Sequence, residues 1–289
     1  MKWEGQRTSS NVEDRRSLGR GARVGGGIGI GGVVIALAAW GLFGINPMTT
    51  LGVINNVSGG GSAQIAQGPA VQPPADDRAA QFVSTVLAST EDAWNQVFAA
   101  GGARYQVPKL VLYRGITPTA CGTGQSAMGP FYCPGDQKIY LDMDFFDTMN
   151  RQMGAPGEFA RAYVIAHEVG HHVQTLLGIT QKVDALRGRI SKTQENANSV
   201  RVELQADCFA GVWANRSQQA KQWLERGDIE SALNAAQKIG DDHLQRQQTG
   251  VVRPETFTHG SSAQRQRWFN QGLQTGDINA CNTLTAQTL

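Results

Sequence analysis

The stretch that decides the fold is EFARAYVIAHEVGHHVQTLLG, residues 158–178. Its apolar residues recur at helical spacing, so it predicts one helix from Glu158 to Leu177. His167 and His171 are four residues apart, which places both imidazoles on one face of that helix. The apolar stretch before them indicates a buried helix, where an unpaired imidazole would be costly. We therefore expect the two histidines to bind a metal, and the alternative, ordinary helix histidines, is disfavoured.

Glu168 directly follows the first of these histidines. It is rotated from His167 by about 100° around the helix axis, close to the metal but outside the row of ligands. From that position its carboxylate can take a proton from a metal-bound water, as in peptidases with the H-E-x-x-H spacing. We predict Glu168 as the general base.

A catalytic zinc ion takes three protein ligands and keeps a fourth position for water, so a third ligand must come from another element. The segment SVRVELQADCFAGVWA, residues 199–214, offers Glu203 and Asp207 four residues apart on a predicted helix. Such a pair usually forms a solvated acidic face, but here the neighbours are apolar and a buried charge needs a partner. We assign Glu203 to the metal and Asp207 to the second nitrogen of a ligand histidine.

Hydrolysis of an amide also needs a donor for the oxyanion that develops at the scissile carbonyl. His259 lies in PETFTHGSSAQRQRWF, residues 254–269, in a loop just before a predicted helix. Arg265 follows six residues later, so both side chains are candidates to point into a catalytic cleft. The alternative is a capping segment at the protein surface.

The four cysteines lack the C-x-x-C spacing of metal-thiolate and thioredoxin sites. An even number in a secreted domain indicates two disulfides. Cys121 and Cys133 bracket a loop rich in Gly and Pro and are expected to pair, which leaves Cys208 with Cys281 by elimination. Four reduced cysteines in a cytosolic enzyme are the alternative.

The N-terminal region divides into three parts by charge. Residues 1–23 are basic, and residues 24–45 carry no charge and are long enough for one transmembrane helix of about 20 residues. The positive-inside rule then places residues 1–23 in the cytoplasm and the rest of the chain outside. Residues 46–75, rich in Gly, Ser, Gln and Pro, predict a flexible linker. A cleaved signal peptide is the alternative, but the apolar run is long for one.

The remaining residues, 76–289, are expected to form one α+β domain, mostly helical with a small sheet. The patterns predict helices at 76–100, 158–177, 193–217, 228–240 and 261–275, and strands that begin at Lys109 and Lys138. We expect the second strand to pair with an extended substrate. The chain would then be held in a bacterial cytoplasmic membrane by its contact with the bilayer through residues 24–45.

The overall charge excludes one class of partner. The chain has 26 basic and 24 acidic residues and a formal net charge of +2, which creates no field that would gather nucleic acid. We therefore expect no nucleic-acid partner and look instead to a peptide or protein substrate.

Segments over nearly the whole chain resemble a family, the neutral zinc metallopeptidases of bacteria, which are single-pass membrane proteins. They include KWEGQRTSSNVEDRR, AHEVGHHVQ, RVELQADCFAGVWA, IGDDHLQ and FTHGSSAQRQRWFNQGLQTGDINAC. The resemblance implies a zincin-like peptidase of the gluzincin type with one zinc ion per chain. It makes His167, His171 and Glu203 the ligands and Glu168 the base.

The late T-H-G segment and Arg265 are also similar to membrane peptidases of the CAAX-processing and heat-shock type. In that group a late His and Arg help to hold the transition state, which implies this role for His259 and Arg265. This chain has Thr258-His259-Gly260 where that group has T-H-P.

We therefore expect a membrane-anchored zinc metalloendopeptidase. Two alternatives stay open. One is a scaffold or binding protein of the cell envelope whose zinc is structural and closed by four protein ligands. The other is a zinc amidase that acts on cell-wall peptide.

Overall fold

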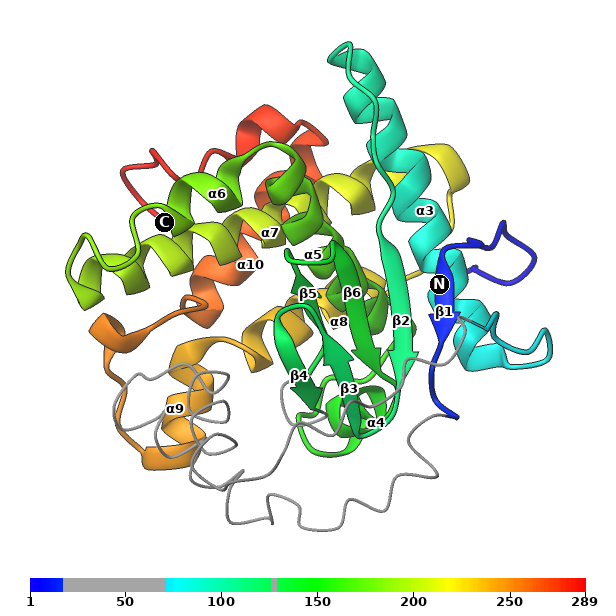
Figure 1. Ribbon diagram of the computed structural model, residues 1–289, viewed down its shortest axis with the longest axis horizontal. Coiled ribbons are helices and arrows are strands. Elements are labelled where there is room, and N and C mark those ends of the chain that lie inside the picture. The colour runs from blue at the N-terminus through cyan, green and yellow to red at the C-terminus, as the bar shows by residue number, and fades with distance from the viewer. Residues whose placement is uncertain (18–70, 126–128) are drawn as a thin grey trace.

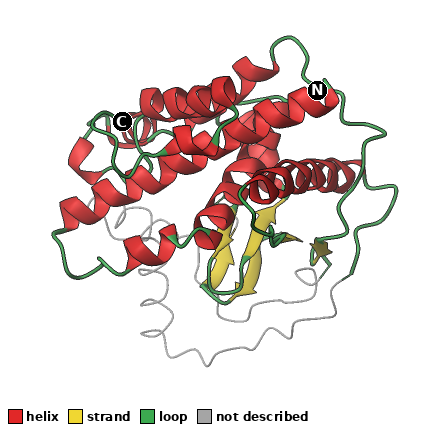
Figure 2. Ribbon diagram, turned by 90° about the horizontal axis from the view of Figure 1, so that it is seen from above, coloured by secondary structure: helices red, strands yellow, loops and turns green. Residues whose placement is uncertain are grey.

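The structure, a computed structural model, describes residues 1–17, 71–125 and 129–289. Within these ranges a four-stranded sheet packs against a mostly helical body (Figure 1), which confirms the expected α+β class. Figure 2 shows most of the helices gathered to one side of the strands.

The sheet has the strand order β1-β2-β6-β5. Its strands are β1 (Val12–Asp14), β2 (Lys109–Tyr113), β6 (Lys138–Asp142) and β5 (Phe131–Cys133). β1, β2 and β6 run parallel, and β5 pairs antiparallel with β6. A separate hairpin joins β3 (Ile116–Thr119) and β4 (Gly122–Gln125). Because β6 is paired on both sides, the expectation that this strand pairs with a substrate is wrong.

The helices follow the predicted pattern, with three additions. The predicted ones are α3 (Arg78–Ala100), α5 (Glu158–Leu176), α7 (Lys192–Lys221), α8 (Asp228–Lys238) and α10 (Ser262–Thr275). The additions are α4 (Asp144–Arg151), α6 (Ile179–Asp184) and α9 (Asp241–Thr249), with two short 3₁₀ helices, η3 (Pro254–Thr256) and η4 (Ile278–Cys281). The additions are six to nine residues long, which is too short for a sequence pattern to distinguish a helix from a strand.

Two glycines bring the backbones of α7 and α10 into direct contact. A Cβ atom at Gly211 would collide with the carbonyl oxygen of Phe269, and one at Gly272 would collide with that of Cys208. Only glycine fits at such an approach, since any side chain would push the helices apart. This close crossing brings the beginning of α10 next to α7, the helix that contains the predicted ligand Glu203.

Residues 1–17 are part of the folded domain. β1 continues the parallel sheet beside β2, and Trp3, 4% exposed, packs edge-on against Phe82 of α3. Glu91 of α3 accepts hydrogen bonds from Arg7 and Ser9. We had expected residues 1–23 to be separate from the domain, and this packing corrects that expectation for residues 1–17.

The docking also bears on the expected topology. Strands β1 and β2 are hydrogen-bonded, so residues 1–17 and the domain must lie on one side of any membrane. A single crossing within residues 24–45 would place them on opposite sides. The expected transmembrane helix, 24–45, and most of the expected linker, 46–75, lie outside the described residues. In the ranges that the structure does describe, no helix combines the length and apolar character of a membrane span.

Both expected disulfides are present. Cys121 pairs with Cys133 across the glycine-rich loop, and Cys208 of α7 pairs with Cys281 of η4. The second bond ties the C-terminal segment to the centre of α7.

Candidate metal centre

Helices α5 and α7 bring the three predicted metal ligands together. One donor atom from each of His167, His171 and Glu203 lies within 4.8 Å of the other two. The Nε2 atom of His167 lies 3.2 Å from one oxygen of Glu203, and Nε2 of His171 lies 3.5 Å from the other. Two imidazole nitrogens and a carboxylate are the donor set of a catalytic zinc site with an open fourth position. The residues therefore fit zinc.

The ionisation of these three residues suits the binding of a cation. Burial opposes the charged form of His171, but the Glu203 carboxylate outweighs it and raises the pKa of His171 to about 9. In turn, although burial opposes ionisation of Glu203, the histidines hold its pKa well below the usual value. Without a metal, Glu203 is held as an anion, and the raised pKa values of His167 and His171 favour their protonated forms. A divalent ion can take the place of those protons.

Glu168 is buried beside this group, with 7% of its surface exposed. Burial raises the pKa of its carboxyl, while both neighbouring histidines lower it. A carboxyl with a raised pKa is suited to accept and return a proton near neutral pH. The role of Glu168 as the base stays a prediction from the sequence.

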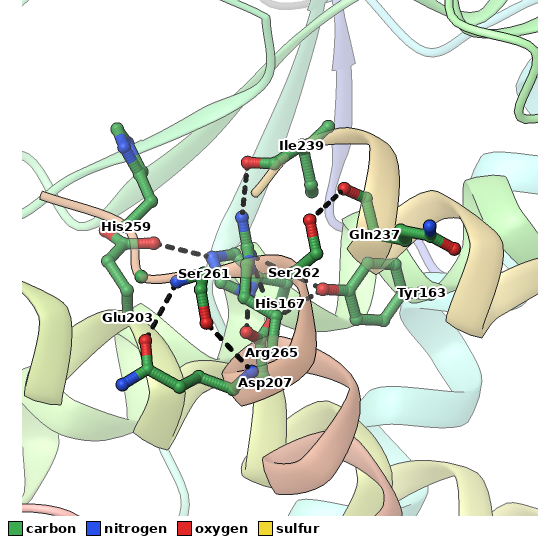
Figure 3. A network of polar contacts seen from close by, with 12 residues as sticks. Tyr163, His167, Glu203, Asp207, Gln237, Ile239, His259, Ser261, Ser262 and Arg265 are labelled. Carbon is green, nitrogen blue, oxygen red and sulfur yellow. Dashed lines mark hydrogen bonds and ion pairs between the residues drawn. The ribbon is translucent and has the colours of Figure 1, made fainter. Parts of the chain in front are cut away.

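Asp207 orients the first histidine, as Figure 3 shows. Its Oδ1 lies 2.8 Å from Nδ1 of His167 and accepts a hydrogen bond from the Tyr163 hydroxyl at 2.5 Å. Although burial opposes ionisation, Arg265 and His167 lower the pKa of Asp207 to about 2, so it is a carboxylate. The Nδ1 proton of His167 therefore points to Asp207, and Nε2 points to the metal position.

Arg265 lies behind the site rather than in a cleft. It is 2% exposed, and its Nε and Nη2 donate to the two oxygens of Asp207 at 2.8 and 2.9 Å. We had expected Arg265 to point at the substrate and help hold the transition state. The structure instead makes it the counter-ion of Asp207, and its Nη2 also lies 3.4 Å from Nδ1 of His167 and from the Tyr163 hydroxyl.

His259 lies beside Glu203 in Figure 3, and its side chain is 40% exposed. Its Nδ1 contacts Oδ1 of Asp241 at 3.2 Å and the Thr258 hydroxyl at 3.0 Å. Burial opposes the charged form, but Asp241 and Glu203 outweigh it and raise the pKa of His259. The role of His259 as an oxyanion donor stays a prediction from the sequence.

Asp241, at the start of α9, is a residue that the sequence analysis missed. Its Oδ2 accepts the backbone N–H groups of Thr258, His259 and Gly260 at 2.7, 2.6 and 3.0 Å. One carboxylate thus fixes the whole T-H-G loop and holds the imidazole of its histidine. IGDDHLQ, the segment that contains Asp241, was a visible signal, since it is among the segments that carry the family resemblance.

His172 has no place among the ligands. It is 1% exposed, its Nε2 donates to the carbonyl oxygen of Gln106 at 2.6 Å, and its Nδ1 lies 3.2 Å from the Tyr132 hydroxyl. These contacts link α5 to the loop before β2 and to β5, so His172 has a structural role.

Comparison with known proteins gives a consistent identity. A family model described as "Putative neutral zinc metallopeptidase" matches residues 1–284. The chain is 49% identical over 290 residues to "Uncharacterized protein YpfJ" of Escherichia coli strain K12, covering 98% of each chain. It is 44% identical over 221 residues to "Uncharacterized protein Rv2575" of Mycobacterium tuberculosis, covering 72% of this chain and 73% of the relative. No solved structure matches the chain significantly. The chain therefore belongs to the "Putative neutral zinc metallopeptidase" family.

Proposed function

We propose that this protein is a zinc metallopeptidase that hydrolyses peptide bonds with one zinc ion per chain. The observation that carries the proposal is the convergence of two imidazoles and a carboxylate beside a buried fourth residue, Glu168. That arrangement supplies the parts that metal-assisted hydrolysis needs, which are ligands, an open coordination position and a proton acceptor.

His167, His171 and Glu203 would hold the zinc, which when bound supplies a Lewis acid and lowers the pKa of water. Glu168 accepts the proton of the attacking water and later gives it to the leaving amine. His259 donates a hydrogen bond to the carbonyl oxygen as negative charge develops there. Asp241 holds that imidazole in place, and its charge favours the protonated, donating form.

The donor set favours a catalytic site over a structural one. A structural zinc ion is normally closed by four protein ligands. Over the ranges that the structure describes, the metal-binding group consists of three residues. His259 is not one of these three residues. This geometry supports turnover and argues against the scaffold alternative.

We further propose that the domain works outside the cytoplasm, on a peptide or protein substrate. Its two disulfides support this location, because such bonds persist in oxidising compartments. The docking of residues 1–17 implies that they share that compartment. A contact with the bilayer through residues 24–45 remains a prediction from the sequence.

The test uses the whole chain, because residues 1–17 belong to the domain. Bound zinc is measured, and cleavage of a mixed peptide library is followed for the wild type, Glu168→Gln and the control Glu158→Gln at the start of the same helix. We expect Glu168→Gln to keep its zinc and lose cleavage, while the control cleaves normally. A wild type that binds zinc firmly and cleaves nothing would overturn the proposal in favour of a scaffold.

A further inference from the structure

The second metal-ligand histidine has a partner that differs in kind from Asp207. Gln174 lies one helical turn after His171 on α5 and is fully buried. Its Oε1 lies 2.9 Å from Nδ1 of His171. Its amide nitrogen donates to the backbone oxygen of Val202 at 2.7 Å and to Oε1 of Gln205 at 3.0 Å. Both of those partners are acceptors, so the amide nitrogen of Gln174 must face them and its oxygen must face the imidazole.

Gln205 extends the chain of hydrogen bonds to the C-terminal segment. It is 5% exposed, and its Nε2 donates to the carbonyl oxygen of Cys281 at 3.0 Å. Cys281 is itself fixed to α7 by the disulfide with Cys208. Each amide in the series accepts with its oxygen and donates with its nitrogen. The series therefore has a single direction, which begins with a proton on Nδ1 of His171.

We propose that Gln174 and Gln205 are positioning residues that keep the proton of His171 on Nδ1 and turn Nε2 toward the zinc. The inference rests on the proposed function, because it assigns the residues to that same metal site. A histidine that binds a metal needs its other nitrogen held by an acceptor, which fixes both the tautomer and the ring plane. Gln174 supplies this acceptor directly. Gln205 prevents the amide of Gln174 from flipping, which would exchange its oxygen and nitrogen.

Charge explains why an amide rather than a carboxylate stands here. Glu168, Glu203 and Asp207 already lie in or beside this site, and Arg265 is bonded to Asp207. A further buried carboxylate at position 174 would add an anion close to the others without a cation of its own, which is costly. A glutamine fixes the imidazole without adding charge.

The test compares Gln174→Met and Gln205→Met, which keep the side-chain volume but remove the hydrogen bonds. Asn196→Leu is the matched control, since it removes a buried amide of α7 that donates to the backbone oxygen of Glu255, away from the metal ligands. Zinc affinity is measured by competition with a chelator. In parallel, the Nδ1–H proton of His171 is observed by NMR in metal-free and zinc-loaded protein, where a hydrogen bond protects it from exchange.

We expect a protected Nδ1–H signal in the wild type and its loss in Gln174→Met, together with a fall in zinc affinity of about 10- to 100-fold. Gln205→Met should show a smaller fall, and Asn196→Leu should bind zinc like the wild type. If Gln174→Met keeps the protected proton and binds zinc as tightly as the control, the inference is wrong. If the wild type binds no zinc, the proposed function fails, and the NMR signal still decides whether Gln174 positions the ring.

Discussion

Asp207 accepts the Nδ1 proton of His167 at 2.8 Å with one oxygen and holds the Nε of Arg265 at 2.8 Å with the other. Both Asp207 and Arg265 are almost completely buried, at 0% and 2% exposure. The arginine keeps the carboxylate charged, and the charged carboxylate keeps His167 in the tautomer that presents Nε2 to the metal. α10 therefore contributes to a site whose ligands all lie on α5 and α7.

The pair predicts a characteristic response to mutation. Arg265→Met should lower the free energy of unfolding by about 3–5 kcal/mol, because it leaves the Asp207 carboxylate buried without its cation. The double variant Arg265→Met with Asp207→Asn should be more stable than the single variant, because it leaves no buried carboxylate without a cation. Denaturant titration of the metal-free proteins measures both. Equal losses in the single and double variants would contradict the charge argument.

His259 is predicted to act on catalysis rather than on zinc. Loss of one oxyanion donor typically lowers kcat by about 100- to 1000-fold, and we expect this from His259→Phe with zinc content unchanged. Asp241→Asn should have a weaker effect of the same kind, because it loosens the loop without removing the imidazole. His243→Ala, a change on the same helix as Asp241, serves as the control. Loss of zinc from His259→Phe would instead identify His259 as a fourth ligand.

The parts of the site that could be predicted from the sequence are those in which spacing along one helix determines which side chains meet. The grouping of His167, Glu168 and His171 follows from a four-residue spacing, and so does the placement of Glu203 and Asp207 on one face of α7. These relations survive folding because the helical repeat is local. The same local rule would have found Gln174, three residues after His171, had its amide been considered as an acceptor.

Contacts between distant segments could not be predicted in this way. Asp241 makes hydrogen bonds to residues 17 to 19 positions later in the chain, and a helix of nine residues such as α9 is too short to be recognised from its pattern. β1 has three residues, which is too short for an alternating pattern. Its basic surroundings also match the flank of a membrane anchor, so charge alone gave no sign that residues 1–17 pack on the domain.

The two disulfides should differ in their contribution to stability. Cys208–Cys281 closes 73 residues and Cys121–Cys133 closes 12. The entropy of loop closure favours the longer loop by about 1.5 kcal/mol. The double variant Cys208→Ser with Cys281→Ser should therefore lower the denaturation midpoint more than the double variant Cys121→Ser with Cys133→Ser. The reverse order would show that strain or packing, rather than chain entropy, dominates.

Docking of residues 1–17 predicts a single compartment for both parts of the chain. A cysteine introduced at the exposed Ser10 and one at the exposed Thr249 should react equally with a membrane-impermeant thiol reagent in intact cells. The four native cysteines are all in disulfides and do not interfere. Labelling at position 249 with protection at position 10 would mean that the N-terminal segment lies across a membrane from the domain.

The docked segment should also be released by acid. Glu13 of β1 is 6% exposed and accepts ion pairs from Arg15, Lys138 and Lys109. Burial raises the pKa of its carboxyl, but these three cations outweigh it and lower the pKa. A carboxyl whose pKa falls on docking stabilises the docked state above its usual pKa, about 4.3, and loses this contribution as the pH falls through the lowered value.

Hydrogen exchange of β1 followed by mass spectrometry measures this release. In the wild type, protection of β1 should fall below about pH 4, before the protection of α5 is lost. Glu13→Gln should show weak protection of β1 already at neutral pH, because its amide cannot balance three cations. Glu4→Gln is the control, since Glu4 and its partner Arg78 are both 69% exposed and their ion pair contributes little. If β1 and α5 lose protection together at every pH, the segment unfolds only with the whole domain, and Glu13 is not what holds it.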